Sequence, residues 1–169
     1  GEPADSRRRP LSTDVQLRPY VEADLAACLT LFDSNVPQFF APHERPEFED
    51  WLRAVPTDYL VAEVGGQLVA CGGWYGRDDE ARLCWGLVAR GLHGQGVGRA
   101  LLDARLKAIR ATPGVRAVSI TTSQLSEGFF VKHGFEVTKR EVNGLAPGLD
   151  RVEAQRSEEH TSELQSRVD

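Results

Sequence analysis

A glycine-rich segment at residues 93–100, His-Gly-Gln-Gly-Val-Gly-Arg-Ala, carries the clearest chemical signal in the sequence. It follows a short, mostly apolar run at 82–88 and precedes a run at 99–110 whose apolar residues recur at helical spacing. Glycines let a backbone approach a ligand closely, and the N–H groups at a helix start favour negative charge. Strand, glycine loop and helix together predict an anion site of the kind that holds phosphate groups.

Other phosphate-binding loops fit this spacing less well. A dinucleotide loop needs Gly-x-Gly-x-x-Gly, and Arg99 stands where the third glycine would fall. A P-loop needs a following Gly-Lys-Ser/Thr, which is not present. A turn that serves only chain geometry is the remaining alternative, and three glycines at two-residue intervals before a good helix argue against it.

The composition indicates one globular domain in water. The chain has 169 residues, of which 41% are hydrophobic and 27% charged, enough for an ordinary core. A formal charge of −5, without a basic stripe of interleaved aromatics, argues against a nucleic-acid partner, and no apolar run approaches a membrane span. Cys28, Cys71 and Cys84 lack Cys-x-x-Cys spacing, which predicts free thiols and a cytoplasmic location. The four histidines form no metal-ligand pattern, so we expect no metal.

Both ends of the chain differ in character from its middle. Residues 1–13 have no apolar run behind their arginines, which predicts a disordered lead-in without a signal peptide. Residues 156–166 resemble a translated sequencing adapter, and only Leu164 among them is a strong hydrophobe. We therefore expect a single domain over 14–155 and a non-native or disordered tail over 156–169, a natural polar tail being the alternative.

Alternating and helical apolar patterns divide that domain into strands and helices. The expected strands are 15–18, 59–64, 67–75, 80–88, 117–121, 135–142 and 151–155. The expected helices are 22–34, 46–52, 99–110 and 124–132. This order predicts a mixed α/β layout in one layered domain, of the α+β class.

A second motif lies at Ser123–Phe135, where a small polar residue opens a short helix that ends in an aromatic pair and then Gly-Phe. Taken with the glycine loop, it makes the chain from Val15 to Gln155 resemble the GCN5-related N-acetyltransferase superfamily. That family's loop reads Gln/Arg-x-x-Gly-x-Gly/Ala, and His93 takes the leading position here. The resemblance implies a mostly antiparallel twisted sheet of six or seven strands, with splayed strands four and five and about four flanking helices.

The resemblance also implies acetyl-CoA as a cosubstrate. Backbone N–H groups of the loop would hold its pyrophosphate, with Arg99 adding a charge-assisted bond. Backbone groups of the preceding strand would bind the pantetheine arm and the thioester oxygen. The residues expected to bind the cofactor are Leu87, Val88, His93, Gly94, Gln95, Gly96, Val97, Gly98, Arg99, Ala100, Ser123 and Phe130.

The acid and the base are less clear. The family often has a tyrosine where this chain has Phe130, which cannot donate a proton. Ser126, one helical turn earlier, could order a water, or CoA could leave as a thiolate. Glu80, with Asp79 behind it, is the candidate general base, and solvated turn carboxylates are the alternative.

For several further residues the sequence allows either a structural role or a chemical one. For Cys84 we expect an ordinary strand position, and for His133 an electrostatic preference for a helix end. Phe39, Phe40 and Trp51 could wall a small acceptor, but a lid that packs on the core is the favoured reading. Trp74 and Tyr75 could face the same cleft.

The function expected from this sequence is transfer of an acetyl group from acetyl-CoA to an amine of a small molecule or peptide. The alternative is an acyl-CoA-binding sensor or a catalytically weak homologue, which the phenylalanine at 130 keeps open. A non-binding interaction module is a third possibility. The expected partner is the amine acceptor alone, without nucleic acid or membrane, in a monomer or homodimer.

Overall fold

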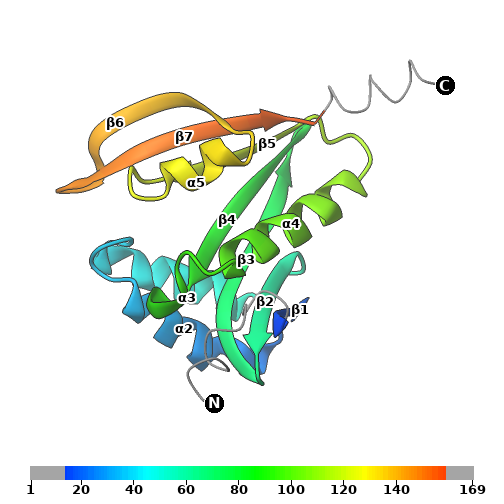
Figure 1. Cartoon of the computed structure of the whole chain (residues 1–169), viewed down its shortest axis with the longest axis vertical. Coiled ribbons are helices and arrows are strands. Elements are labelled where there is room, and N and C mark those ends of the chain that lie inside the picture. Colours follow the sequence, from blue (N-terminus) through cyan, green and yellow to red (C-terminus); the bar gives the residue numbers. More distant parts are fainter. Residues whose placement is uncertain (1–13, 159–169) are drawn as a thin grey trace, which may run out of the picture.

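Seven strands form one sheet in the order β1-β2-β3-β4-β5-β7-β6 in the computed structural model, which describes residues 14–158 (Figure 1). Every neighbouring pair is antiparallel except β4 and β5, which run parallel. The strands are β1 Gln16–Pro19, β2 Tyr59–Val64, β3 Gln67–Arg77, β4 Glu80–Val88, β5 Ala117–Thr122, β6 Glu136–Ala146 and β7 Leu149–Ser157.

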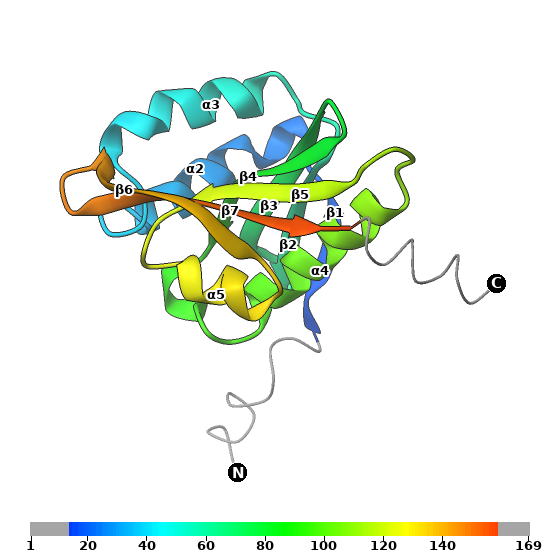
Figure 2. The same ribbon diagram turned by 90° about the horizontal axis from the view of Figure 1, so that it is seen from above.

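Four α-helices cover the two faces of this sheet. Figure 2 shows α2 and α3 on one face and α4 and α5 on the other. The helices are α2 Leu25–Ser34, α3 Arg45–Arg53, α4 Val97–Arg110 and α5 Glu127–Lys132, with short 3₁₀ turns η2 Glu22–Asp24, η3 Pro42–Glu44 and η4 Arg90–Leu92. The expected α+β class and layered sheet are therefore confirmed.

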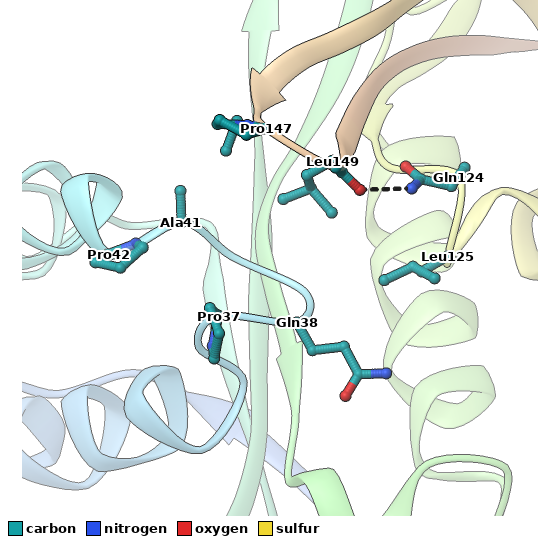
Figure 3. A pocket seen from close by; sticks show the side chains of 10 residues that line it. Pro37, Gln38, Ala41, Pro42, Gln124, Leu125, Pro147 and Leu149 are labelled. Atoms are coloured by element: carbon teal, nitrogen blue, oxygen red, sulfur yellow. Dashed lines mark hydrogen bonds between the residues drawn. The ribbon is translucent and has the colours of Figure 1, made fainter.

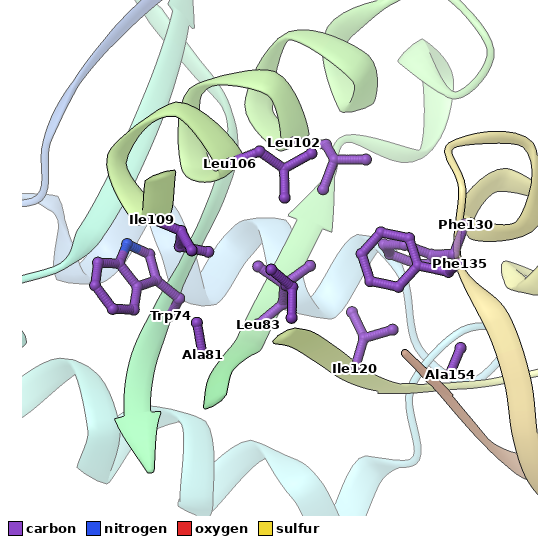
Figure 4. Close-up of a cluster of buried hydrophobic side chains, with 11 residues drawn as sticks. Trp74, Ala81, Leu83, Leu102, Leu106, Ile109, Ile120, Phe130, Phe135 and Ala154 are labelled. Carbon is purple, nitrogen blue, oxygen red and sulfur yellow. The ribbon is translucent and has the colours of Figure 1, made fainter. Parts of the chain in front are cut away.

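Alternation along β3 divides the core between the two faces. Cys71 packs with α2 and α3, whereas Ala70 packs against α4 near its start. Trp74 lies further along the α4 face, in the cluster that α4 shares with α5 (Figure 4). Because side chains alternate across a strand, this one strand supplies apolar groups to both layers.

Strands β4 and β5 pair over only three residues each and then separate. Their register joins Glu80–Arg82 to Ala117–Ser119, and the rest of β4 has no partner on that side. An irregularity in the β3–β4 ladder lies at the same place, between Cys71 and Gly73, and Trp85 has a φ of 45° there. A bulge of this kind bends a strand and increases its twist. The splay expected from the resemblance is present, and it opens toward Val88.

The C-terminal strand extends past the expected domain end. The predicted strand over 151–155 is instead Leu149–Ser157, and Arg156 pairs with Val118 of β5. Glu158 is buried and lies 3.2 Å from Arg110 of α4. The boundary predicted at residue 155 therefore falls inside β7. The lead-in expected over 1–13 and the remainder of the expected tail, 159–169, lie outside the described residues.

Candidate active site

The glycine loop leads into α4 with free N–H groups at its end. Gly94 and Gly96 have φ values of 82° and 87°, in the left-handed region that glycine adopts without strain. Helix α4 begins at the buried Val97, two residues earlier than expected. Its first bond runs from the Ala100 N–H to the Gly96 carbonyl over 3.0 Å. The N–H groups of the first turn have no helical acceptor, so they can bind an anion.

Positively charged groups and one aromatic ring surround this loop. The Arg90 guanidinium lies 5.7 Å from the Phe39 ring centre, and the His93 ring meets the same phenylalanine edge-on at 4.8 Å. Arg99 is mostly exposed on α4 and lies 3.8 Å from Asp103. An exposed pair of that kind is weak, so Arg99 can turn toward a phosphate group.

The open end of the splay is built around the backbone of Val88. The Ala89 N–H donates to the Val69 carbonyl of β3, and Leu87 pairs with Cys71. Antiparallel alternation therefore directs the Leu87 N–H toward β3 and the Val88 N–H toward the splay. Of the two strand residues expected to bind the cofactor through their backbone, Val88 is the one so placed.

Asn35 directly follows the helix predicted over 22–34, and the sequence alone assigned it no role. It is fully buried, and its Nδ2 donates to the carbonyls of Leu31 and Val88, both at 3.0 Å. The His93 Nε2 lies 2.9 Å from the same Val88 carbonyl. Asn35 therefore ties the end of α2 to the end of β4. The only local feature that distinguishes Asn35 in the sequence is that this polar residue directly precedes Val36-Pro37.

The second motif forms the other wall of the splay. The Ser123 carbonyl accepts the N–H groups of Ser126 and Glu127, and its hydroxyl accepts that of Leu125, so Ser123 shapes the turn before α5. The Ser126 side chain makes no capping bond. Phe130 is buried and meets Phe129 and Phe135 edge-on, which is the packing role expected for it.

Glu80 lies at the closed end of the splay. It pairs with Ala117, and its carboxylate accepts hydrogen bonds from Gln155 at 3.3 Å and Arg82 at 3.4 Å. Val88 is eight positions further along β4, or about 26 Å at ~3.3 Å per residue. The structure brings Val88, Ser123 and Ser126 to the same end of the sheet but does not bring Glu80 there.

The side chains of Cys84 and His133 are held by packing and hydrogen bonding within the fold. Burial raises the pKa of the Cys84 thiol to about 12, which leaves it almost entirely protonated near neutral pH. The His133 Nδ1 lies 2.8 Å from the Phe129 carbonyl, and its ring packs on the Phe129 ring. Cys84 therefore lacks the activation that a nucleophile needs, and the contacts of His133 hold its ring against α5.

The aromatic residues considered for the acceptor side pack into the core. Phe40 contacts Phe32 and Trp85, and Trp51 contacts Tyr59 and Tyr75. The expected packing on the core is therefore confirmed for Phe40 and Trp51, and a lid stays a prediction. Trp74 is 9% exposed and packs beneath α4, so the suggestion that it faces the same cleft is wrong (Figure 4).

A pocket of about 450 Å³ lies between three segments that are distant in sequence (Figure 3). One wall is the segment 37–42 before α3, the second is the turn at 124–125, and the third is the hairpin at 146–149. The Gln124 amide joins the last two walls, since its Nε2 donates to the Gly148 carbonyl at 2.9 Å and its Oε1 accepts the Asp150 N–H at 2.8 Å.

Arg105 is a further residue that the sequence reasoning missed. It is 3% exposed, and its Nη1 donates to the Gly73 carbonyl at 3.3 Å, while its Nε has no partner among residues 14–158. Gly72 and Gly86 leave room for the guanidinium, because a Cβ at either would lie 3.3 Å from it. Desolvation by burial lowers the pKa of Arg105 to about 10.

The described part of the chain, residues 14–158, contains neither a candidate membrane span nor a candidate metal site. No helix there is long and apolar enough to cross a membrane. No group of three or more histidine, cysteine, aspartate or glutamate side chains there could hold a metal ion.

Comparisons with known proteins agree with this geometry. The family model described as acetyltransferase (GNAT) matches residues 25–135. Ard1 from Thermoplasma volcanium superposes with a TM-score of 0.72 at 20% identity, covering 85% of this chain and 97% of that one. Ribosomal-protein-alanine N-acetyltransferase from Brucella melitensis superposes with a TM-score of 0.66 at 24% identity, covering 84% of this chain and 99% of that one.

A third structure was solved with ligands. N-acetylglutamate synthase from Neisseria gonorrhoeae, complexed with coenzyme A and N-acetyl-glutamate, has a TM-score of 0.65 at 15% identity, covering 85% of this chain and 35% of that one. No curated protein sequence is significantly similar to the chain. At these identities the solved structures establish the fold, and the family model establishes the family.

Proposed function

The chain belongs to the acetyltransferase (GNAT) family, and we propose that it transfers an acetyl group from acetyl-CoA to an amine. The observation that carries the proposal is the open end of the β4–β5 splay, where the Val88 N–H, the glycine loop and the start of α5 meet. Acetyl-CoA needs an anion site for its pyrophosphate and, close by, a strand edge for its thioester end, and this chain has both.

The residues present fit coenzyme A. The first turn of α4 offers N–H groups without protein acceptors, and Gly94 and Gly96 hold the left-handed conformations that expose them. Arg90 and Arg99 add positive charge around the same loop. When bound, acetyl-CoA supplies the activated acetyl group. The protein supplies the anion site and the strand edge that position it.

The remaining steps fall to the backbone and to one hydroxyl. The Val88 N–H is directed into the splay, where it would stabilise negative charge on the reacting carbonyl oxygen. Ser126 has an uncommitted hydroxyl at the start of α5 and would hold the water that protonates the departing sulfur. Glu80 is too distant along β4 to take the acceptor's proton, so in this proposal the amine loses that proton to solvent.

Phe130 supports a second candidate function. Its ring is buried between Phe129 and Phe135, so no proton donor stands at this position. A chain that binds acyl-CoA with little turnover, as a sensor or a weak homologue, would keep the glycine loop and tolerate this packing.

Two measurements separate the candidates. Thermal unfolding with and without coenzyme A reports binding, because a ligand that binds only the folded protein raises its midpoint. Release of free thiol from acetyl-CoA, followed with a panel of primary amines, reports transfer. Saturable binding together with amine-dependent thiol release supports the acetyltransferase. Saturable binding without thiol release beyond hydrolysis would leave the sensor as the function.

A further inference from the structure

The pocket beside the splay has a chemical character that points to one class of acceptor. We propose that it takes a small primary amine whose remaining body is apolar and carries no second charge. This inference rests on the proposed acetyl transfer and extends it to the substrate class.

The pocket's position supports an acceptor role. Gln124 and Leu125 line it directly after β5 ends at Thr122, at the open end of the splay. Its opposite wall begins at Pro37, two residues after Asn35, whose side chain is bonded to the Val88 carbonyl. Two of the pocket's walls are therefore fixed to the ends of the two strands between which the thioester would lie.

The lining contains no ionisable side chain. Its residues are Pro37, Gln38, Ala41, Pro42, Gln124, Leu125, Ala146, Pro147, Gly148 and Leu149. Both ends of the Gln124 amide are already bonded to the hairpin. Gln38 makes no hydrogen bond with the described residues, and Figure 3 shows its side chain projecting toward Leu125. The neutral amide of Gln38 is therefore the polar side chain of the lining that is free to bind a ligand, and the rest of the lining is mostly apolar.

Charged residues that border the lining are held elsewhere. The Glu44 carboxylate accepts the Ala41 N–H at 2.9 Å, and the Asp150 carboxylate accepts the Asn143 N–H at 2.9 Å. The lining itself offers no counter-ion, so a carboxylate or second ammonium on the acceptor would lose water without compensation from it, which is costly. An apolar body would instead gain from contact with the proline and leucine side chains.

The size and stiffness of the pocket favour a small molecule. Its volume of about 450 Å³ lies within the usual range for small-molecule sites, about 300–1,000 Å³. Three prolines line it, and their fixed φ makes the walls largely preformed.

Matched amines test the proposal. The pairs are 2-phenylethylamine with phenylalanine, and hexylamine with 1,6-diaminohexane, each pair differing by one added charge. We expect kcat/KM for the uncharged-body member to be at least about tenfold higher. The same order is expected for binding to the CoA-loaded protein, measured by calorimetry without turnover. Equal or better use of phenylalanine or the diamine would overturn the proposal.

Variants locate the preference in the pocket. Leu125→Asp places a carboxylate on an exposed lining residue and should reduce kcat/KM for hexylamine about tenfold while improving the diamine. The matched control is Val131→Asp on α5, equally exposed and outside the lining. An unchanged amine ranking in Leu125→Asp would contradict the site. If amines bind in the expected order but none is acetylated, the proposed transfer fails and the pocket's specificity stands. If none binds, the pocket proposal fails as well.

Discussion

Replacing Arg105 by methionine should stabilise the protein, because the structure buries this cation without a carboxylate. Within the described residues its side chain makes one hydrogen bond, to the Gly73 carbonyl, and its Nε has no partner. Burial lowers the pKa of Arg105 to about 10 from an ordinary arginine value above 12. Since the folded pKa lies below the unfolded one, the charged side chain opposes folding at every pH below about 10.

The magnitude follows from that pKa. At about 1.4 kcal/mol per pKa unit, the burial of charge costs about 3 kcal/mol. Loss of the charged hydrogen bond to Gly73 removes about 1.5–3 kcal/mol, and burial of the methionine side chain returns a similar amount. The last two contributions nearly cancel, so the net change for Arg105→Met is a gain of about 3 kcal/mol in the free energy of unfolding. For a domain of this size the midpoint of thermal unfolding should rise by about 6–12 °C.

Thermal and urea unfolding, both followed by circular dichroism, measure this change. The matched control is Lys107→Met on the exposed side of the same helix, which should stay within about 0.5 kcal/mol of the parent. A fall in the unfolding midpoint for Arg105→Met, with an unchanged urea m-value, would refute the reasoning. That result would mean that the guanidinium is fully solvated or bonded where it lies.

Three further outcomes follow from the site. Gly96→Glu should weaken coenzyme A binding at least about tenfold by calorimetry, whereas Gly96→Ala, which carries only the strain of a positive φ, should weaken it less. Phe130→Tyr should raise turnover and add a limb at high pH if a proton donor is missing there; an unchanged pH–rate profile would remove that idea. Cys84 should react with iodoacetamide at pH 8 about a thousandfold more slowly than free cysteine, because burial raises its pKa to about 12; rapid labelling of the folded protein would contradict this.

Local signals predicted the parts of this fold that depend on neighbouring residues. The predicted strands 59–64 and 67–75 leave only Gly65-Gly66 between them, a spacing typical of a tight hairpin, and both glycines have positive φ, at 59° and 81°. The loop at 93–98 predicted the start of α4 for the same reason, since a glycine turn and a helical pattern are both short-range features.

The site depends on long-range placement, which spacing along the chain does not contain. Glu80 was chosen because it opens the fourth strand, but β5 pairs with that end and leaves the other end open. Asn35 lies just beyond the helix predicted over 22–34, and nothing in the local sequence indicates that its side chain crosses to Val88, 53 residues away. The pocket likewise joins 37–42 to 124–125 and 146–149, three segments brought together only by the sheet order.

The position of Arg105 in the helical pattern contains information about a long-range contact. Arg105 lies one turn after Leu101 and one turn before Ile109, so the helical period places it in the middle of the buried stripe of α4. A charged residue at such a position requires space on the surface that the helix covers. Gly72 and Gly86 provide that space on two neighbouring strands. A cation inside an apolar stripe therefore predicts small residues on the strands it faces, and here it would have placed α4 over the bulge between β3 and β4, beside the splay where the proposed reaction takes place.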